Sequence, residues 1–216
     1  MAMLGNCNSR QNKIFNDKQA SQMEKDLSFQ VRCGPRTPGS ACHQRIQEWI
    51  VLSLTEQKWQ VETQSFSYGQ IKGTNIIGKY GNGEEFIIIG AHYDTRFTSD
   101  QEKQVELRAQ PVPGANDGAS GVALLLLLSR EIPQQISAAE QTIWLVFFDL
   151  EDNGNYPGRD WILGSTAFAG SLTQTPSAVI VVDMIGDRDL NIYMEHNSTA
   201  ELNQEIWQTA QQLGYE

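Results

Sequence analysis

Three apolar stretches of the chain each run directly into side chains that can bind a metal ion or transfer a proton. The stretches are 86–91, 143–148 and 178–182, and the side chains that follow them are His92, Asp94, Asp149, Glu151, Asp152 and Asp183. Divalent cations recruit carboxylates as ligands, and a histidine combined with several acids suits zinc. The residue types therefore favour a zinc site with a spare carboxylate for proton transfer.

A fourth candidate ligand, Asp117, lies among the small residues of 114–121, just before a leucine-rich stretch. Small residues let the backbone pass close to a bound ion, and the N-terminus of a helix favours a nearby anion. Gathering this many carboxylates without a cation is costly because of repulsion and desolvation. A divalent metal ion is the natural compensation.

Each of these residues also has an ordinary structural interpretation. His92 could be a buried histidine with satisfied hydrogen bonds, Asp117 could cap a helix, and Asp183 could be a turn acid. Their joint placement at consecutive strand ends is what favours the metal site over these alternatives.

The three apolar stretches have the continuous composition of strands buried on both faces of a sheet. Helix candidates at 121–132 and 165–172 separate them, so strands and helices alternate. Such alternation predicts right-handed crossovers and a largely parallel sheet. Sites in open α/β sheets form beyond the carboxyl ends of the strands, so we expect the candidate side chains to line one crevice.

The N-terminal half predicts further elements around this sheet. Ser40 can cap a helix whose apolar positions recur at helical spacing as far as Leu54. The segments 60–68 and 74–80 read as an antiparallel pair of strands, and Gly81–Gly83 is a hairpin turn signal.

The composition bounds the other classes of function. A net charge of −10 works against binding nucleic acid or an anionic membrane surface. The longest apolar run, 122–128, is too short for a membrane helix, so we expect no transmembrane segment. Residues 1–22 are polar and resemble a disordered leader, which leaves 23–216 as one domain.

The cysteines allow two interpretations. Cys33 and Cys42 could form a disulfide across the Gly34-Pro35 turn, or they could be free thiols. Cys7 ends a segment that resembles a bacterial lipoprotein signal only vaguely, because the apolar stretch is absent. We expect an extracytoplasmic or secreted location, although no signal sequence is visible.

From about Arg36 onward, the chain resembles the M28 zinc aminopeptidases and the related glutaminyl cyclases. The motifs that carry the resemblance are His92-Tyr93-Asp94, Gly114-Ala115-Asn116-Asp117, Glu151-Asp152 and Asp183-Met184-Ile185-Gly186. The resemblance implies a three-layer helix–sheet–helix fold with a mixed, mainly parallel sheet. It also implies one or two zinc ions and a substrate that is the N-terminus of a peptide or protein.

The resemblance also assigns a role to each residue. It implies that Asp117 is the central metal ligand, with His92 and Asp183 at one metal position and Asp152 at the other. Glu151 would be the proton-transferring base. Asp94 would orient His92 from behind.

Two features favour the cyclase branch, in which an N-terminal glutamine becomes pyroglutamate. The turn Arg36–Ser40 resembles the Arg-x-Pro-Gly-Ser turn of glutaminyl cyclases. The segment 153–164 resembles their longer loop after the acid pair, and its Trp161 would form a substrate-binding wall or would merely pack the loop. The alternatives are a zinc aminopeptidase, or an inactive M28-like interaction domain or gene fragment.

The chain departs from the family pattern at two places. Asp152 stands where glutamate is usual, and the family's last ligand is a histidine that neither His43 nor His196 matches. We expect a short strand at 190–194 and an amphipathic helix at 199–213, after which the catalytic domain looks truncated. The 216-residue chain should then bind zinc weakly, or only at the His92 position, and show little cyclase activity.

Overall fold

The computed structural model describes residues 16–139, 141–154 and 157–215. The chain forms two compact units, one from Ser21 to Leu190 and a smaller one whose described residues are 16–20 and 191–215. The division at residue 190 has no signal in the sequence. Among the described residues, no helix combines the length and apolarity that crossing a membrane requires.

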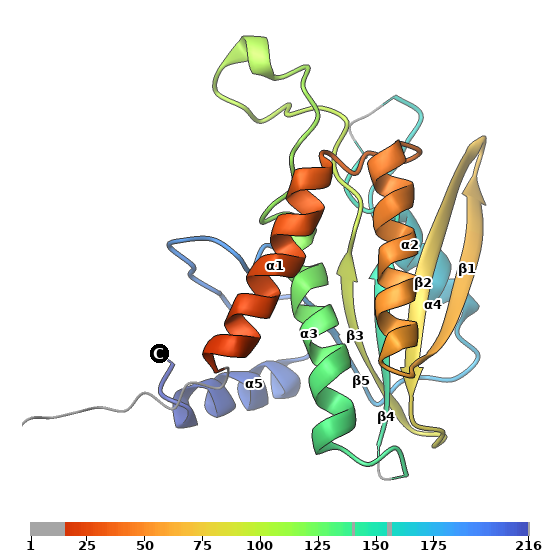
Figure 1. Ribbon diagram of the computed structural model, residues 1–216, viewed down its shortest axis with the longest axis vertical. Coiled ribbons are helices and arrows are strands. Elements are labelled where there is room, and N and C mark those ends of the chain that lie inside the picture. Colours follow the sequence, from red (N-terminus) through yellow and green to blue (C-terminus); the bar gives the residue numbers. More distant parts are fainter. Residues whose placement is uncertain (1–15, 140, 155–156, 216) are drawn as a thin grey trace, which may run out of the picture. The chain divides into compact units, whose positions relative to one another are not determined.

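Five strands of the larger unit form one mixed sheet in the order β1-β2-β4-β3-β5 (Figure 1). They are β1 (Gln60–Tyr68), β2 (Ile71–Tyr80), β3 (Phe86–His92), β4 (Thr142–Phe148) and β5 (Ala178–Val181). β3 pairs in parallel with both β4 and β5, whereas β2 is antiparallel to β1 and to β4. The predicted mixed, mainly parallel sheet is confirmed.

Helices cover both faces of this sheet (Figure 1). One face carries α1 (Asp17–Cys33), α2 (Ala41–Glu56) and α3 (Ala119–Gln135), and the other carries α4 (Leu163–Ser171). The short 3-10 helix η1 (Val105–Leu107) lies in the loop after β3, and α5 (Ala200–Gln212) belongs to the smaller unit. The larger unit therefore has the expected three-layer architecture.

The core explains why the central strand is continuously apolar. Leu145 and Phe147 of β4 pack in the cluster beneath α2 and α3, whereas Val146 and Phe148 pack in the cluster on the opposite face with Phe168 of α4. A strand buried on both faces needs apolar side chains at every position, not at alternate ones.

The start of α2 is held in two ways. Ser40 is its N-cap, and the Ser40 hydroxyl accepts a hydrogen bond from the His43 N–H at 3.1 Å. Cys33 at the end of α1 and Cys42 in the first turn of α2 form a disulfide. Of the two interpretations of these cysteines, the bridge is therefore the one observed.

Three expectations were wrong. Residues 17–22 were assigned to a disordered leader but begin α1, while residues 1–15 lie outside the described part of the chain. Residues 190–194 form no strand, and none of the described strands pairs with them. The turn at 81–83 joins β2 to β3, but they are not a hairpin, because β4 lies between them.

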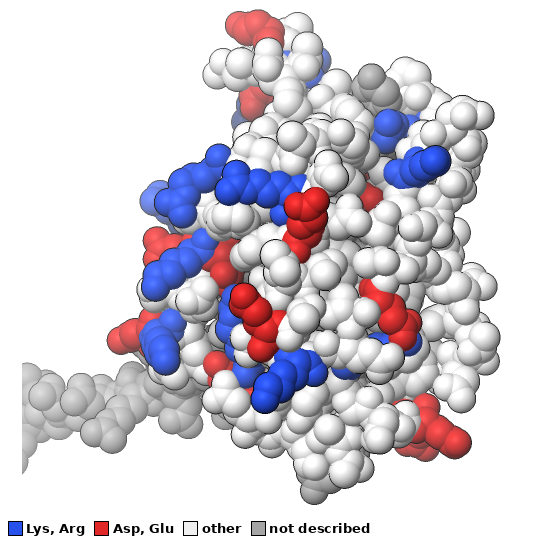
Figure 2. All heavy atoms as spheres, turned by 45° about the vertical axis from the view of Figure 1, so that its right-hand side comes forward, with Lys and Arg blue, Asp and Glu red and all other residues white. Residues whose placement is uncertain are grey.

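Charged side chains of both signs share the face shown in Figure 2, where Lys and Arg lie interspersed with Asp and Glu. This mixture differs from the clustered basic face by which proteins typically bind the phosphate backbone of nucleic acids.

Candidate active site

The strand ends and the segment before α3 bring the candidate side chains together. An open pocket of about 460 Å³ lies at these strand ends. Its lining includes all five residues predicted to share a crevice, the predicted wall residue Trp161 and the cation Arg96, the five being His92, Asp117, Glu151, Asp152 and Asp183. The predicted crevice beyond the carboxyl ends of β3, β4 and β5 is therefore present.

Three of these residues form a compact donor set. His92 Nε2 lies 2.9 Å from Asp117 Oδ1 and 3.4 Å from Asp183 Oδ1. One potential ligand atom from each of the three residues lies within 4.8 Å of the other two. One imidazole nitrogen and two carboxylate oxygens at this spacing fit a zinc ion.

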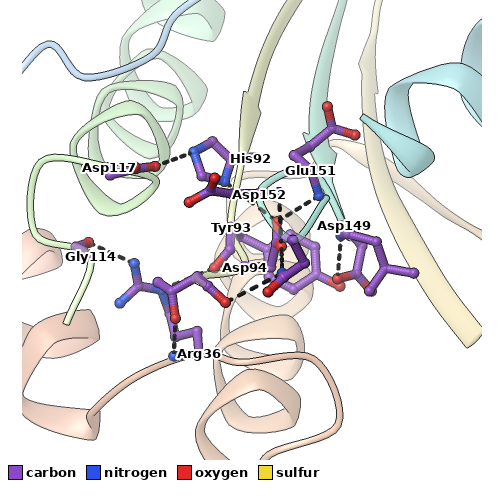
Figure 3. A network of polar contacts seen from close by, with 12 residues as sticks. Arg36, His92, Tyr93, Asp94, Gly114, Asp117, Asp149, Glu151 and Asp152 are labelled. Atoms are coloured by element: carbon purple, nitrogen blue, oxygen red, sulfur yellow. Dashed lines mark hydrogen bonds and ion pairs between the residues drawn. The ribbon is translucent and has the colours of Figure 1, made fainter. Parts of the chain in front are cut away.

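Whereas Asp117 lies on the Nε2 side of the His92 ring, Asp94 is fully buried and lies on the Nδ1 side (Figure 3). Its carboxylate is 3.4 Å from His92 Nδ1 and accepts hydrogen bonds from the Glu151 N–H at 3.1 Å and from the Asn153 side-chain amide at 2.9 Å. One carboxylate thus fixes the imidazole of β3 relative to the loop after β4. A carboxylate that orients a ligating histidine in this way is common in metal sites.

The charges of the site raise or lower several pKa values. Burial alone would lower the pKa of His92, but its contacts with Asp117, Asp183 and Asp94 raise it well above the usual value. Burial would likewise raise the pKa of Asp94, yet the hydrogen bonds it receives lower it. The negative potential that favours a proton on the imidazole also favours a divalent cation between the three ligands.

Asp152 does not join the compact donor set. Its Oδ1 lies 3.7 Å from the guanidinium of Arg96, and its Oδ2 is buried without a hydrogen-bond partner among the described residues. Burial, followed by repulsion from Asp117, raises the pKa of Asp152 to about 7. A buried oxygen of this kind remains available to a cation.

Glu151 lines the same pocket, and its carboxylate is hydrogen-bonded to α4. Its two carboxylate oxygens accept hydrogen bonds from the N–H and the hydroxyl of Ser165 in α4. Burial raises the pKa of Glu151, and the two hydrogen bonds from Ser165 oppose this rise. A raised pKa brings a carboxylate closer to the range in which it can both accept and donate a proton near neutral pH.

Trp161 stands at the rim of the pocket and is 40% exposed. The guanidinium of Arg96 lies 5.0 Å from the centre of its ring. A Cβ atom at Gly154 would lie only 2.3 Å from the ring, so Trp161 packs closely against the backbone there. The side chain is thus held in place while part of it remains open to the pocket.

Sequence reasoning missed two residues that hold the site. Arg36 was noted only as part of a turn motif, but its buried guanidinium donates to the carbonyls of Tyr93, Pro113 and Gly114. An arginine within a Gly- and Pro-rich turn was the available signal. His43, whose Nε2 lies 2.7 Å from Asp149 Oδ1, had no comparable signal, and neither residue lines the pocket.

Comparison with known proteins agrees with this geometry. The family model of peptidase family M28 matches residues 75–216. The chain belongs to peptidase family M28. This M28 chain is 29% identical over 181 residues to the glutaminyl-peptide cyclotransferase of Drosophila melanogaster, covering 76% of its own length and 48% of that protein.

Two solved structures share the fold of this M28 chain. The glutaminyl cyclase of Porphyromonas gingivalis is 32% identical with a TM-score of 0.85, and the match covers 91% of this chain and 72% of that one. A Zn-dependent exopeptidase from Parabacteroides distasonis is 28% identical with a TM-score of 0.83, over 91% of this chain and 73% of that one. The M28 fold is therefore shared with both cyclases and exopeptidases.

Proposed function

We propose that this M28 chain acts as a zinc-dependent glutaminyl-peptide cyclotransferase, which converts an N-terminal glutamine into pyroglutamate. The observation that carries the proposal is the place of Trp161, which lies in the loop after the acid pair and lines the same pocket as Glu151 and Asp152. Similarity to glutaminyl cyclases by sequence and by structure supports the same choice.

The metal-binding part of the proposal rests on the donor set. His92, Asp117 and Asp183 would hold a zinc ion, and Asp152 would contribute its buried oxygen to a second position next to Asp117. Bound zinc supplies Lewis acidity that polarises the side-chain amide carbonyl of the substrate glutamine.

The chain's own residues would carry the proton transfers. Glu151 would take a proton from the substrate's α-amine as that amine attacks the side-chain amide, and would deliver it to the departing ammonia. Asp94 would keep the His92 ring in one orientation. Trp161 would form an apolar wall that suits a small, neutral glutaminyl side chain.

An M28 zinc aminopeptidase is the second candidate, because the similarity to a Zn-dependent exopeptidase is almost as strong as that to the cyclases. In that reaction, Glu151 would take a proton from the attacking water molecule instead of from the amine. Both candidates act on the N-terminus of a peptide or protein.

An extracytoplasmic or secreted location remains part of the proposal. The Cys33–Cys42 disulfide supports it, since such bonds persist mainly in oxidising compartments.

A side-by-side assay tests the two candidates. The zinc-loaded protein is offered a glutaminyl peptide and an aminoacyl amide, and we expect cyclisation of the former to be faster. In a version extended past residue 216 to supply the family's last histidine ligand, Glu151→Gln should lower turnover by on the order of a hundredfold and leave the zinc content unchanged, whereas the exposed Glu48→Gln should change neither. Faster hydrolysis of the amide would identify a peptidase, and near-normal turnover of Glu151→Gln would refute its role as the base.

A further inference from the structure

Ser165, in the first turn of α4, donates hydrogen bonds to both carboxylate oxygens of Glu151. Its backbone N–H donates to Oε1 at 2.6 Å, and its hydroxyl donates to Oε2 at 2.8 Å. The backbone of Glu151 is also hydrogen-bonded to the residue that precedes α4, since the Glu151 carbonyl accepts the N–H of Ile162 at 3.0 Å. A charged carboxylate with both oxygens engaged by one residue is confined to a single orientation.

The local backbone brings Ser165 close enough to Glu151 for both hydrogen bonds. Ile162 precedes α4 in the left-handed region with φ of 53°, which turns the chain back toward the end of β4. A Cβ atom at Gly164 would lie 2.1 Å from the Asp149 carbonyl oxygen and 2.5 Å from Asn75 Oδ1. A glycine at 164 therefore lets the first turn of α4 approach the strand end, where the helix N-terminus favours an anion.

Ser165 acts on the pocket only through Glu151. It is not among the residues that line the pocket, whereas Glu151 is. Each carboxylate oxygen has two lone pairs, so the two hydrogen bonds from Ser165 leave one on each oxygen free to accept a proton. The arrangement holds the carboxylate without blocking it.

We propose that Ser165 is a positioning residue for Glu151, and this inference rests on the proposed role of Glu151 as the base. The serine holds the carboxylate in the orientation from which it meets the substrate's proton. Its removal should slow the chemical step and leave substrate binding nearly unchanged, because no part of Ser165 lines the pocket.

The kinetic test compares two substitutions at the same position. Ser165→Ala keeps the N–H but removes the hydroxyl, and should lower kcat about tenfold while KM stays within about twofold, as expected for loss of one hydrogen bond to a charged group. Ser165→Thr keeps a hydroxyl and should restore most of kcat. Ser171→Ala at the other end of α4 also removes a hydrogen-bonded hydroxyl and should leave kcat unchanged.

A second test does not depend on activity. The melting temperatures of Ser165→Ala, Glu151→Ala and the double variant form a double-mutant cycle. The fall in melting temperature of the double variant should be smaller than the sum of the two single falls by about 2–4 °C. Additive losses would refute the contact. An active enzyme with an unchanged Ser165→Ala kcat would refute the positioning role alone. A wild-type protein that is inactive on both substrates, even when zinc-loaded and extended past residue 216 to supply the family's last histidine ligand, would refute the proposed function and the catalytic role together.

Discussion

Substitution of Arg36 should show how strongly one buried side chain holds the two segments that carry His92 and Asp117. The guanidinium is fully buried and donates to the carbonyls of Tyr93 at 3.0 Å, Pro113 at 3.2 Å and Gly114 at 2.7 Å. Burial lowers its pKa to about 10, so Arg36 is still charged at neutral pH.

The expected loss in the free energy of unfolding follows from the three buried carbonyls that lose their hydrogen-bond donor. Arg36→Met keeps an unbranched apolar stem but removes the guanidinium and with it all three donors. A buried polar group without its partner costs about 1–3 kcal/mol. The variant also avoids the cost of burying the guanidinium, which offsets part of this loss. We therefore expect the free energy of unfolding to fall by about 3–5 kcal/mol. For a chain of this size, the melting temperature should fall by on the order of 10 °C.

Urea and thermal unfolding of the 216-residue chain measure this loss, and zinc titration by calorimetry measures its effect on the site. Zinc affinity should fall, because the turn before Asp117 loses two of its anchors. Arg45→Met is the matched control, since Arg45 is exposed and its guanidinium lies over the Phe29 ring at 5.4 Å. If Arg36→Met remained within about 1 kcal/mol of the wild type, the account of its three hydrogen bonds would be wrong.

The remaining predictions concern the pocket and the disulfide. Zinc should raise the melting temperature more at pH 8 than at pH 5.5, because protons compete for His92 and for Asp152, whose pKa burial raises to about 7; a shift independent of pH would contradict this. In zinc-free protein, the raised pKa of Asp152 should make stability decline from about pH 4 to pH 7, and calorimetry of Asp152→Asn should show a smaller decline. Trp161→Ala should raise KM for a glutaminyl peptide more than it lowers kcat, and the reverse pattern would place Trp161 outside the binding wall. Replacing both Cys33 and Cys42 by serine should cost about 2–3 kcal/mol in urea unfolding, given the short loop that the bridge closes.

Local patterns in the sequence were sufficient for most of the secondary structure. Continuous apolar composition identified β3, β4 and β5, and the strand–helix alternation predicted that they run in parallel. The order of the strands was beyond the reach of these patterns. A turn signal between β2 and β3 suggested neighbours, but β4 lies between them, and in this central place the core clusters on both sides of the sheet bury both of its faces.

The same distinction holds for the site. Acids placed at strand ends could be assembled from the sequence, because the carboxyl ends of parallel strands share one edge of the sheet. The strand pattern alone did not say which of them would come closest. The family resemblance implied that His92, Asp117 and Asp183 share one metal position, and the structure brings ligand atoms of these three within 4.8 Å of one another, while Asp152 turns toward Arg96.

The sequence by itself thus determined the kinds of side chain and the edge at which they gather. Only the tertiary structure decided what holds them. Arg36 meets carbonyls that are 57 to 78 residues away along the chain, and Asp94 accepts the N–H of Glu151 57 residues away. Hydrogen bonds across such separations arise from the packing of distant segments and leave no periodic pattern in the residues that make them.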